Sequence, residues 1–309
     1  MKKNCLKDEF KMLWYTKTFV VLIVALFLFS GVIYFLNVNN TKELYDNYNK
    51  IVEFEKKNPE INSDNSDKYT VEKKDGIVSI SNPRAFYEDK LTKSIDALKI
   101  KNVTSMACEA ALAGFIVIFG LYGVVVGKIE YKNRTYKNKI VRRGRRRYIF
   151  SKLTSLFATS LIASVFYLLF CCLFSLLSYY YIRNKVDVNY FGYNIDARVD
   201  NIVWQLLLTL LLSLIYSLIG NTISTITRET LVGTVIIMVY SFVKMPFGKY
   251  DLSNSISFFS RKICTFEGVI SLTRGGNTNI FLSSAFIICT VAICIILYVF
   301  NIYKRSAYN

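Results

Sequence analysis

Four stretches of this chain contain no charged residue and are each long enough to cross a lipid bilayer. A helix needs roughly 20 mainly apolar residues to cross a hydrocarbon core about 30 Å thick. Because backbone polar groups must be hydrogen-bonded inside lipid, runs of this length are expected to fold as helices. The sequence therefore predicts an all-α membrane protein. The four runs are Thr18–Leu36, Leu153–Ile182, Ile202–Thr227 and Asn277–Tyr303.

Two further stretches bring the predicted number of transmembrane helices to six. Met106–Gly127 is interrupted only by Glu109 near one end, and Thr230–Val243 is short. Lys244 follows this short run, and its long side chain can reach the membrane surface from there. We place the six spans at residues 18–36, 106–127, 153–182, 202–227, 230–247 and 280–303.

The loop between the second and third spans, residues 128–152, is strongly basic. It contains eleven Lys and Arg and one acidic residue. Because cytoplasmic loops of membrane proteins carry the excess of Lys and Arg, this loop is predicted to be cytoplasmic. The segment Met1–Lys17, with five Lys against two acids, and the tail 304–309 share this sign. We therefore expect a multi-pass cell-membrane protein with both termini in the cytoplasm.

The charge also indicates which partners to expect. A net charge of +17 would usually suggest binding to nucleic acid or to anionic lipid. Its basic residues are concentrated beside the predicted spans, so we expect contact with membrane lipid and no nucleic-acid binding.

The remaining segments have distinct predicted structures. Residues 1–17 carry an apolar stripe, including Leu6, Phe10 and Leu13, that is typical of an interfacial amphipathic helix. In the extracytoplasmic loop 37–105 we expect a helix near 44–55, two short strands around Asp75-Gly76 and a helix after Pro83, or partial disorder. An outer loop (183–201), a cytoplasmic turn (228–229) and an outer segment dipping into the membrane (248–279) complete the chain.

Composition excludes several kinds of chemistry. The chain has no His, which removes His-based metal sites and His general bases. It also lacks a Walker A sequence, so it is not predicted to bind ATP itself, and we expect no catalytic residue, metal site or cofactor in this chain. Seven cysteines are present, but Cys264 is the only one in a predicted outer loop, so no disulfide is expected.

Small and polar residues recur along the second and fourth predicted spans. Gly residues spaced three or four apart let helix backbones approach closely in lipid. We predict that these two spans line a permeation path at a subunit interface, and the alternative is ordinary packing within one subunit. The candidate residues are Gly120, Gly123, Gly127, Gln205, Thr209, Ser213 and Asn221.

The order of residues in the basic loop resembles that of the ABC-2 family of ATP-binding-cassette export permeases. That family has an acid after the second span, then a small or hydroxyl residue, and an Arg before a Lys that opens the third span. The matching residues here are Glu130, Thr135, Gly144, Arg146 and Lys152. The Gly usual before Thr is replaced by Arg134, and the Ser usual before Arg by Arg145.

The resemblance implies a permease subunit without its own ATPase, paired with a second permease subunit. ATP and Mg²⁺ would be bound by separate cytoplasmic nucleotide-binding subunits. A helix in the 128–152 loop would dock on those subunits, and the cargo would be a peptide such as an antimicrobial peptide, a drug or a lipid. The expected coupling residues are Glu130, Thr135, Arg142, Arg143, Gly144, Arg146 and Lys152.

Two other functions are compatible with the sequence. A membrane sensor or accessory protein could recognise a peptide through the 37–105 loop. A polytopic lipid-modifying enzyme is less consistent with a chain that has no His and few acidic residues inside its spans.

The predicted topology can be tested by cysteine labelling in intact cells. We expect Ser66→Cys, in a background that lacks Cys264, to react with a membrane-impermeant thiol reagent, because residues 37–105 are predicted to be extracytoplasmic. Absence of labelling in intact cells, with labelling after permeabilisation, would show that the predicted orientation is inverted.

Overall fold

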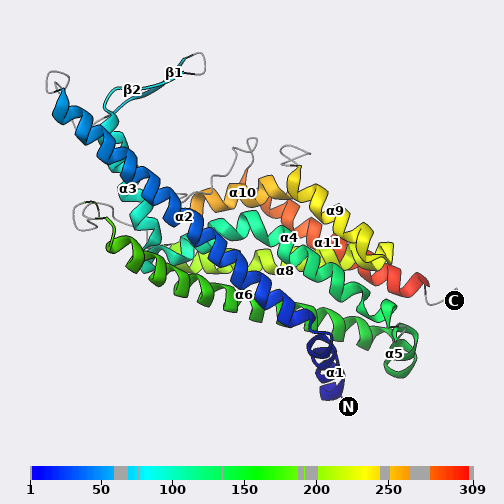
Figure 1. The fold of residues 1–309 in the computed structure, drawn as a ribbon. Coiled ribbons are helices and arrows are strands. Elements are labelled where there is room, and N and C mark those ends of the chain that lie inside the picture. Colours follow the sequence, from blue (N-terminus) through cyan, green and yellow to red (C-terminus); the bar gives the residue numbers. More distant parts are fainter. Residues whose placement is uncertain are drawn as a thin grey trace.

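The computed structural model describes residues 2–58, 69–74, 77–133, 135–186, 191, 201–243, 251–264 and 279–305. Long helices make up most of these residues, and they pack side by side as one elongated bundle (Figure 1). The prediction of an all-α membrane protein is confirmed at this level. The helices are α1 (Lys2–Tyr15), α2 (Thr18–Lys57), α3 (Pro83–Leu98), α4 (Val103–Lys132), α5 (Tyr136–Arg143), α6 (Arg145–Arg183), α8 (Ile202–Thr227), α9 (Thr230–Phe242), α10 (Leu252–Ile263) and α11 (Ile280–Arg305), with a 3₁₀ turn η2 (Ile100–Asn102) before α4.

Five of these helical segments are long and apolar enough to cross a membrane. They are Thr18–Lys57, Ile100–Tyr131, Arg145–Arg183, Ile202–Thr227 and Ile280–Lys304. Helix α9 is also apolar, but it has 13 residues and therefore extends only about 20 Å, less than a hydrocarbon core of about 30 Å. Residues 244–250 lie outside the described part of the chain, so a sixth span at 230–247 stays a prediction.

Beyond the predicted end of the first span, the chain remains helical. Helix α2 runs without interruption from Thr18 to Lys57, so the helix expected near 44–55 is the second half of α2. Helix α3 packs against this half, where the Oγ atoms of Thr41 and Ser94 are 2.6 Å apart. Leu91 and Ile95 of α3 are fully buried. The segment is therefore a helical stalk attached to the bundle.

A short hairpin lies beside the stalk. Strands β1 (Val71–Lys74) and β2 (Ile77–Ile80) pair antiparallel, with Val71 opposite Ile80. Figure 1 shows the hairpin at one end of the molecule, while α1, α5 and the end of α11 lie at the other end. The basic segment 128–152 thus shares one end of the bundle with the first and last described helices.

Close backbone contact between α4 and α8 forms the centre of the bundle (Figure 1). A Cβ atom added to Gly123 would lie 2.1 Å from the carbonyl oxygen of Ser217, and one added to Gly220 would lie 2.0 Å from that of Gly120. Real Cβ contacts are essentially never so short, so these positions require glycine. The small residues let the two helix backbones touch.

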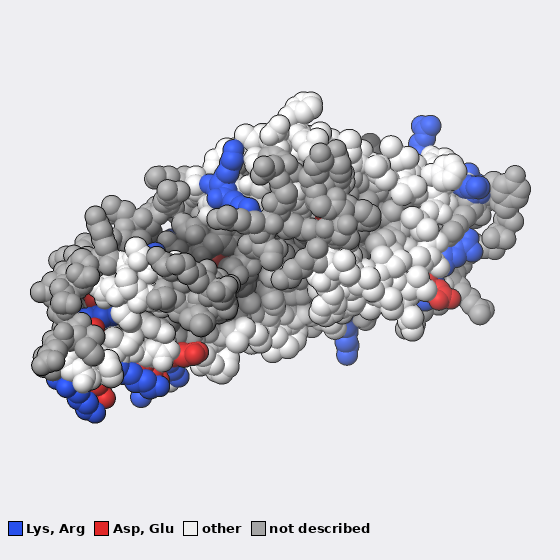
Figure 2. Space-filling view, turned by 90° about the horizontal axis from the view of Figure 1, so that it is seen from above, with Lys and Arg blue, Asp and Glu red and all other residues white. Residues whose placement is uncertain are grey.

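Apolar side chains cover the outside of the bundle. Phe281 of α11 is 82% exposed and Leu28 of α2 is 60% exposed. On the face shown in Figure 2, many charged side chains of the described residues lie towards the two ends, and the described surface between them is uncharged apart from a few Lys and Arg side chains. This distribution suits a molecule whose middle is surrounded by lipid.

The central helix contact makes a stability prediction. Gly123→Ala should destabilise the protein by about 1–3 kcal/mol or more, because the added methyl group forces α4 and α8 apart. The measurement is the thermal unfolding midpoint of the purified protein in detergent. Gly31→Ala is the matched control, because its Cβ would lie 3.2 Å from a ring atom of Phe174, a side chain that can shift. Equal midpoints for the two variants would contradict the assigned packing.

Candidate functional site

The basic segment forms two helices that meet at Gly144. Helix α5 ends at Arg143, Gly144 has φ +74°, and α6 begins at Arg145. A Cβ atom on Gly144 would meet no other atom within 4 Å, so it is the positive φ that favours glycine here. A single helix was expected somewhere in this segment, and the structure has two, separated by this glycine. α5 consequently lies at the end of the bundle, joined to α6 through a sharp corner (Figure 1).

Four helices contribute charged side chains to a cluster beside this corner. The Lys139 Nζ atom of α5 lies 2.7 Å from Glu130 Oε1 of α4 and 2.8 Å from Glu9 Oε1 of α1. The Lys152 Nζ atom of α6 lies 3.3 Å from Glu130 Oε1 and 4.0 Å from Glu9 Oε2. We call Glu9, Glu130, Lys139, Arg143 and Lys152 the charge cluster.

Arg143 and Tyr148 complete the contacts of the two carboxylates. Arg143 donates through Nη1 to Glu9 Oε1 at 2.9 Å and through Nη2 to Asp8 Oδ2 at 2.6 Å. The hydroxyl of Tyr148 donates to Glu130 Oε2. With Asp8 included, three acidic and three basic side chains meet, and their charges balance.

Because the charge cluster is buried, its charged groups must stay close to their partners. Glu9 and Glu130 have no exposed surface, and Lys152 is 1% exposed. Burying a charge is costly unless an opposite charge lies close to it. Burial by itself would lower the pKa of Lys139, but Glu130 and Glu9 raise that pKa above its ordinary value, so the ammonium group stays charged. The four helices are therefore held in one relative arrangement at this end.

The structure separates the predicted coupling residues into three groups. Glu130, Arg143 and Lys152 belong to the charge cluster, whereas the side chains of Arg142 and Arg146 are exposed. Two further predicted residues shape the backbone. The Thr135 N–H donates to the carbonyl of Glu130 at 3.0 Å, at the junction of α4 and α5, and Gly144 forms the α5–α6 corner.

Sequence reasoning missed Glu9, Lys139 and Tyr148. A signal for Glu9 was present, because it follows Leu6 by three residues and precedes Leu13 by four, which places it on the apolar stripe of α1. Leu13 is 2% exposed in the structure. An acid on a buried helix face indicates a basic partner from another segment.

The predicted pathway residues of α8 lie inside the bundle. Thr209 Oγ1 donates to the carbonyl of Gln205 at 2.8 Å, and Ser213 Oγ donates to that of Leu210 at 2.7 Å. The Gln205 side chain accepts from Thr104 Oγ1 at 2.6 Å. Thr209 and Ser213 are thus satisfied within α8 itself, and Gln205 by Thr104 of α4. The buried side-chain amide of Asn221 has no hydrogen-bond partner among the described residues.

The glycines predicted for the same path face neighbouring helices of the same chain. A Cβ on Gly127 would lie 3.0 Å from Asn221 Oδ1, and one on Gly120 would lie 2.9 Å from Ile237 of α9. Gly123 contacts the backbone of α8, as described above. Packing within one subunit, the alternative expected from the sequence, accounts for these positions.

A cavity lies between α1, α2 and α6, apart from the predicted path. Its volume is about 330 Å³, and its lining is mainly apolar. None of the seven predicted pathway residues lines it. The lining residues are Phe10, Lys11, Leu13, Trp14, Tyr15, Phe19, Thr159 and Ile162.

The charge cluster leads to a mutational prediction. Glu130→Gln should lower the free energy of unfolding by about 3–5 kcal/mol, because it removes the closest negative charge from buried Lys152. Asp8→Asn is the control from the same contact network. Its carboxylate side chain is 54% exposed, so its loss should cost about 1 kcal/mol or less. Unfolding midpoints measured in detergent should differ clearly, and similar midpoints would show that the cluster does not hold the helices.

The sequence was compared with known protein families, curated proteins and solved structures. No curated protein and no solved structure matches the chain. A family model described as ABC-2 type transporter matches residues 76–256, which is more than half of the chain and includes α4, α5, α6 and α8. The match covers Glu130, Gly144 and Lys152, on which the resemblance was based. The chain belongs to the ABC-2 type transporter family and is a membrane component of an ABC transporter.

Proposed function

We propose that this chain is an export permease whose motion is driven by a separate ATPase subunit docking on α5 and on the start of α6. Family membership supports a transport role without catalysis by the chain itself. ATP and Mg²⁺ would bind to the partner subunit. A second permease subunit would complete the pathway, and the cargo would be a peptide, a drug or a lipid-like molecule.

The charge cluster is the observation that carries this proposal. Helix α5 lies at the end of the bundle, and Lys139 and Arg143 connect it to α4 and α1. A force on α5 would reach these helices directly, because separating the buried ion pairs costs several kcal/mol. Helix α4 in turn touches α8 along its backbone. A displacement at the surface could thus be transmitted to the centre of the bundle.

Exposed basic residues give the partner a surface to contact. Arg142 and Arg146 lie on either side of Gly144, and both side chains are exposed. Neither has an ion pair among the described residues, in contrast to Arg143. We propose that these two arginines meet acidic groups of the ATPase subunit, while Arg143 and Lys139 anchor α5 to the permease.

The end of the bundle that carries the basic segment also indicates how the protein is oriented in the membrane. Helices α1 and α5 and the end of α11 lie together, opposite the stalk and hairpin (Figure 1). The positive-inside rule supports a cytoplasmic position for the end that contains the basic segment 128–152. The stalk formed by α3 and the second half of α2 would then be extracytoplasmic.

The coupling proposal can be tested with a charge-reversed pair. Arg142→Glu/Arg146→Glu should abolish co-purification with the cognate ATPase subunit, or reduce it at least tenfold, because acidic side chains would repel its docking surface. The charge cluster is not altered, so the thermal unfolding midpoint of the permease alone should change little.

The matched control reverses two exposed lysines at the other end of the molecule. Lys50→Glu/Lys56→Glu changes the net charge equally, but both residues lie on the distal half of α2. This variant should retain the ATPase subunit. Full retention by the arginine variant, or equal loss in both variants, would refute docking at the α5–α6 corner.

A further inference from the structure

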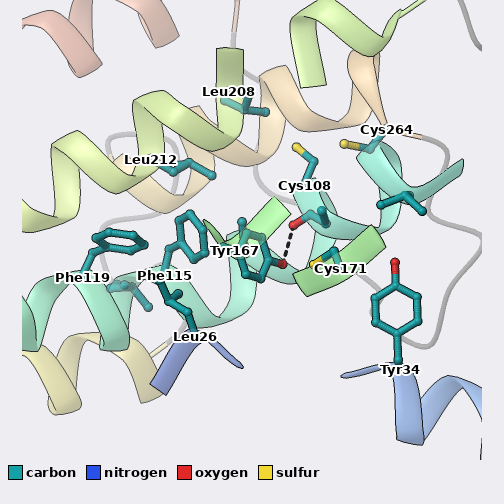
Figure 3. Packing of buried hydrophobic residues seen from close by; sticks show 14 of the residues in the cluster. Leu26, Tyr34, Cys108, Phe115, Phe119, Tyr167, Cys171, Leu208, Leu212 and Cys264 are labelled. Atoms are coloured by element: carbon teal, nitrogen blue, oxygen red, sulfur yellow. Dashed lines mark hydrogen bonds between the residues drawn. The ribbon is translucent and has the colours of Figure 1, made fainter. Parts of the chain in front are cut away.

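Two cysteines that are distant in the sequence lie next to each other in the structure. Cys108 is on the first half of α4, and Cys264 directly follows α10. The two side chains lie near each other in the core (Figure 3), and the Cys108 thiol is a hydrogen-bond partner of the Cys264 thiol. Cys264 therefore has a neighbouring thiol, which was not expected from the sequence because Cys108 falls in a predicted span. α10 packs back against α4 and α8, which brings the two together.

One side chain of α8 fixes the backbone on both sides of this pair. Gln205 accepts from Thr104 Oγ1 at 2.6 Å and donates through Nε2 to the carbonyl of Ile263 at 3.0 Å. Thr104 lies one helical turn before Cys108 on α4, and Ile263 directly precedes Cys264. The Cys264 N–H also donates to the carbonyl of Ser260 at 2.7 Å. Both thiols are thus held by the fold.

We propose that Cys108 and Cys264 are a disulfide-forming pair that can tie the end of α10 to α4. In the presence of a small-molecule disulfide, one cysteine thiolate attacks a sulfur of the reagent and releases one small thiol. The second cysteine then attacks the mixed disulfide, which forms the Cys108–Cys264 bond and releases the other small thiol. The two protein thiols are oxidised, and the reagent is reduced to two thiols.

The surroundings make this exchange slow and its product well protected. The hydrogen bond with Cys108 and burial raise the pKa of the Cys264 thiol, so little thiolate is present at neutral pH. Cys108 is fully buried and Cys264 is 8% exposed. The same burial hinders attack on the finished bond. The pair is therefore suited to forming a long-lived disulfide. It is not suited to a rapidly exchanging redox sensor, which would require more exposed thiols.

The position of the bond sets its effect on the fold. It would join residues that are far apart in the sequence, and cross-links closing long loops restrict the unfolded chain most. It would also hold α10 against the first half of α4, whereas the charge cluster lies at the opposite end of α4. The proposal does not depend on an ATPase partner.

The experiment uses the full-length protein purified in detergent under reducing conditions. After removal of the reductant, it is incubated with oxidised glutathione over several hours, and the remaining thiols are blocked. Protease digestion without reduction, followed by mass spectrometry, should identify one peptide pair joined through Cys108 and Cys264. The thermal unfolding midpoint should rise by several degrees and return to its starting value after dithiothreitol treatment.

Cys108→Ser and Cys264→Ser are the variant controls, and neither should show the rise on oxidation. Cys294→Ser, which removes a half-buried thiol on α11, should respond like the wild type. Peptide mapping of the wild type alone keeps the proposal testable if a variant fails to fold. Glutathione adducts on Cys264 without the joined peptide, or no change at either cysteine after prolonged oxidation, would overturn the proposal.

Discussion

The backbone contact between α4 and α8 is the constraint on which the rest of the bundle depends. Gly123 and Gly220 allow the two helices to approach until the backbone of each touches the other. In lipid, such contacts replace the hydrophobic driving force that operates in water, because the lipid tails are as apolar as the side chains. The other long helices surround this pair and present apolar side chains outward.

The charge cluster gives one end of this arrangement a second type of constraint. Glu130 near the end of α4 is buried beside Lys139 and Lys152, so α4 cannot move there without taking α5 and α6 along or separating charges. Glu9 adds α1 to the same unit. A helix that combines a fixed contact at its centre with a charged anchor at its end can carry displacement into the bundle. This property underlies the proposed coupling to an ATPase.

Much of the architecture was readable from local patterns. Four uncharged runs and one run interrupted only by Glu109 located the five long membrane-type helices. The composition of the basic segment indicated a helix, and the structure divides it into two helices at Gly144. The order of Glu130 and Lys152 around the basic segment led to the family, and the structure brings these two side chains to 3.3 Å. Patterns of this kind succeed because lipid imposes its requirement on each segment separately.

The sequence by itself therefore determined the fold class, the positions of the long helices, the family and part of the charged site. Only the tertiary structure decided the partners of particular side chains. It placed Glu9 against Lys139 and turned Gly123 and Gly127 of α4 toward α8 of the same chain. It also gave Gln205 two partners, next to Cys108 and to Cys264. These contacts join residues more than fifty positions apart, and no local periodicity encodes which distant helix faces will meet. Their pairing follows from the packing of the whole bundle, in which each buried polar group must find its partner.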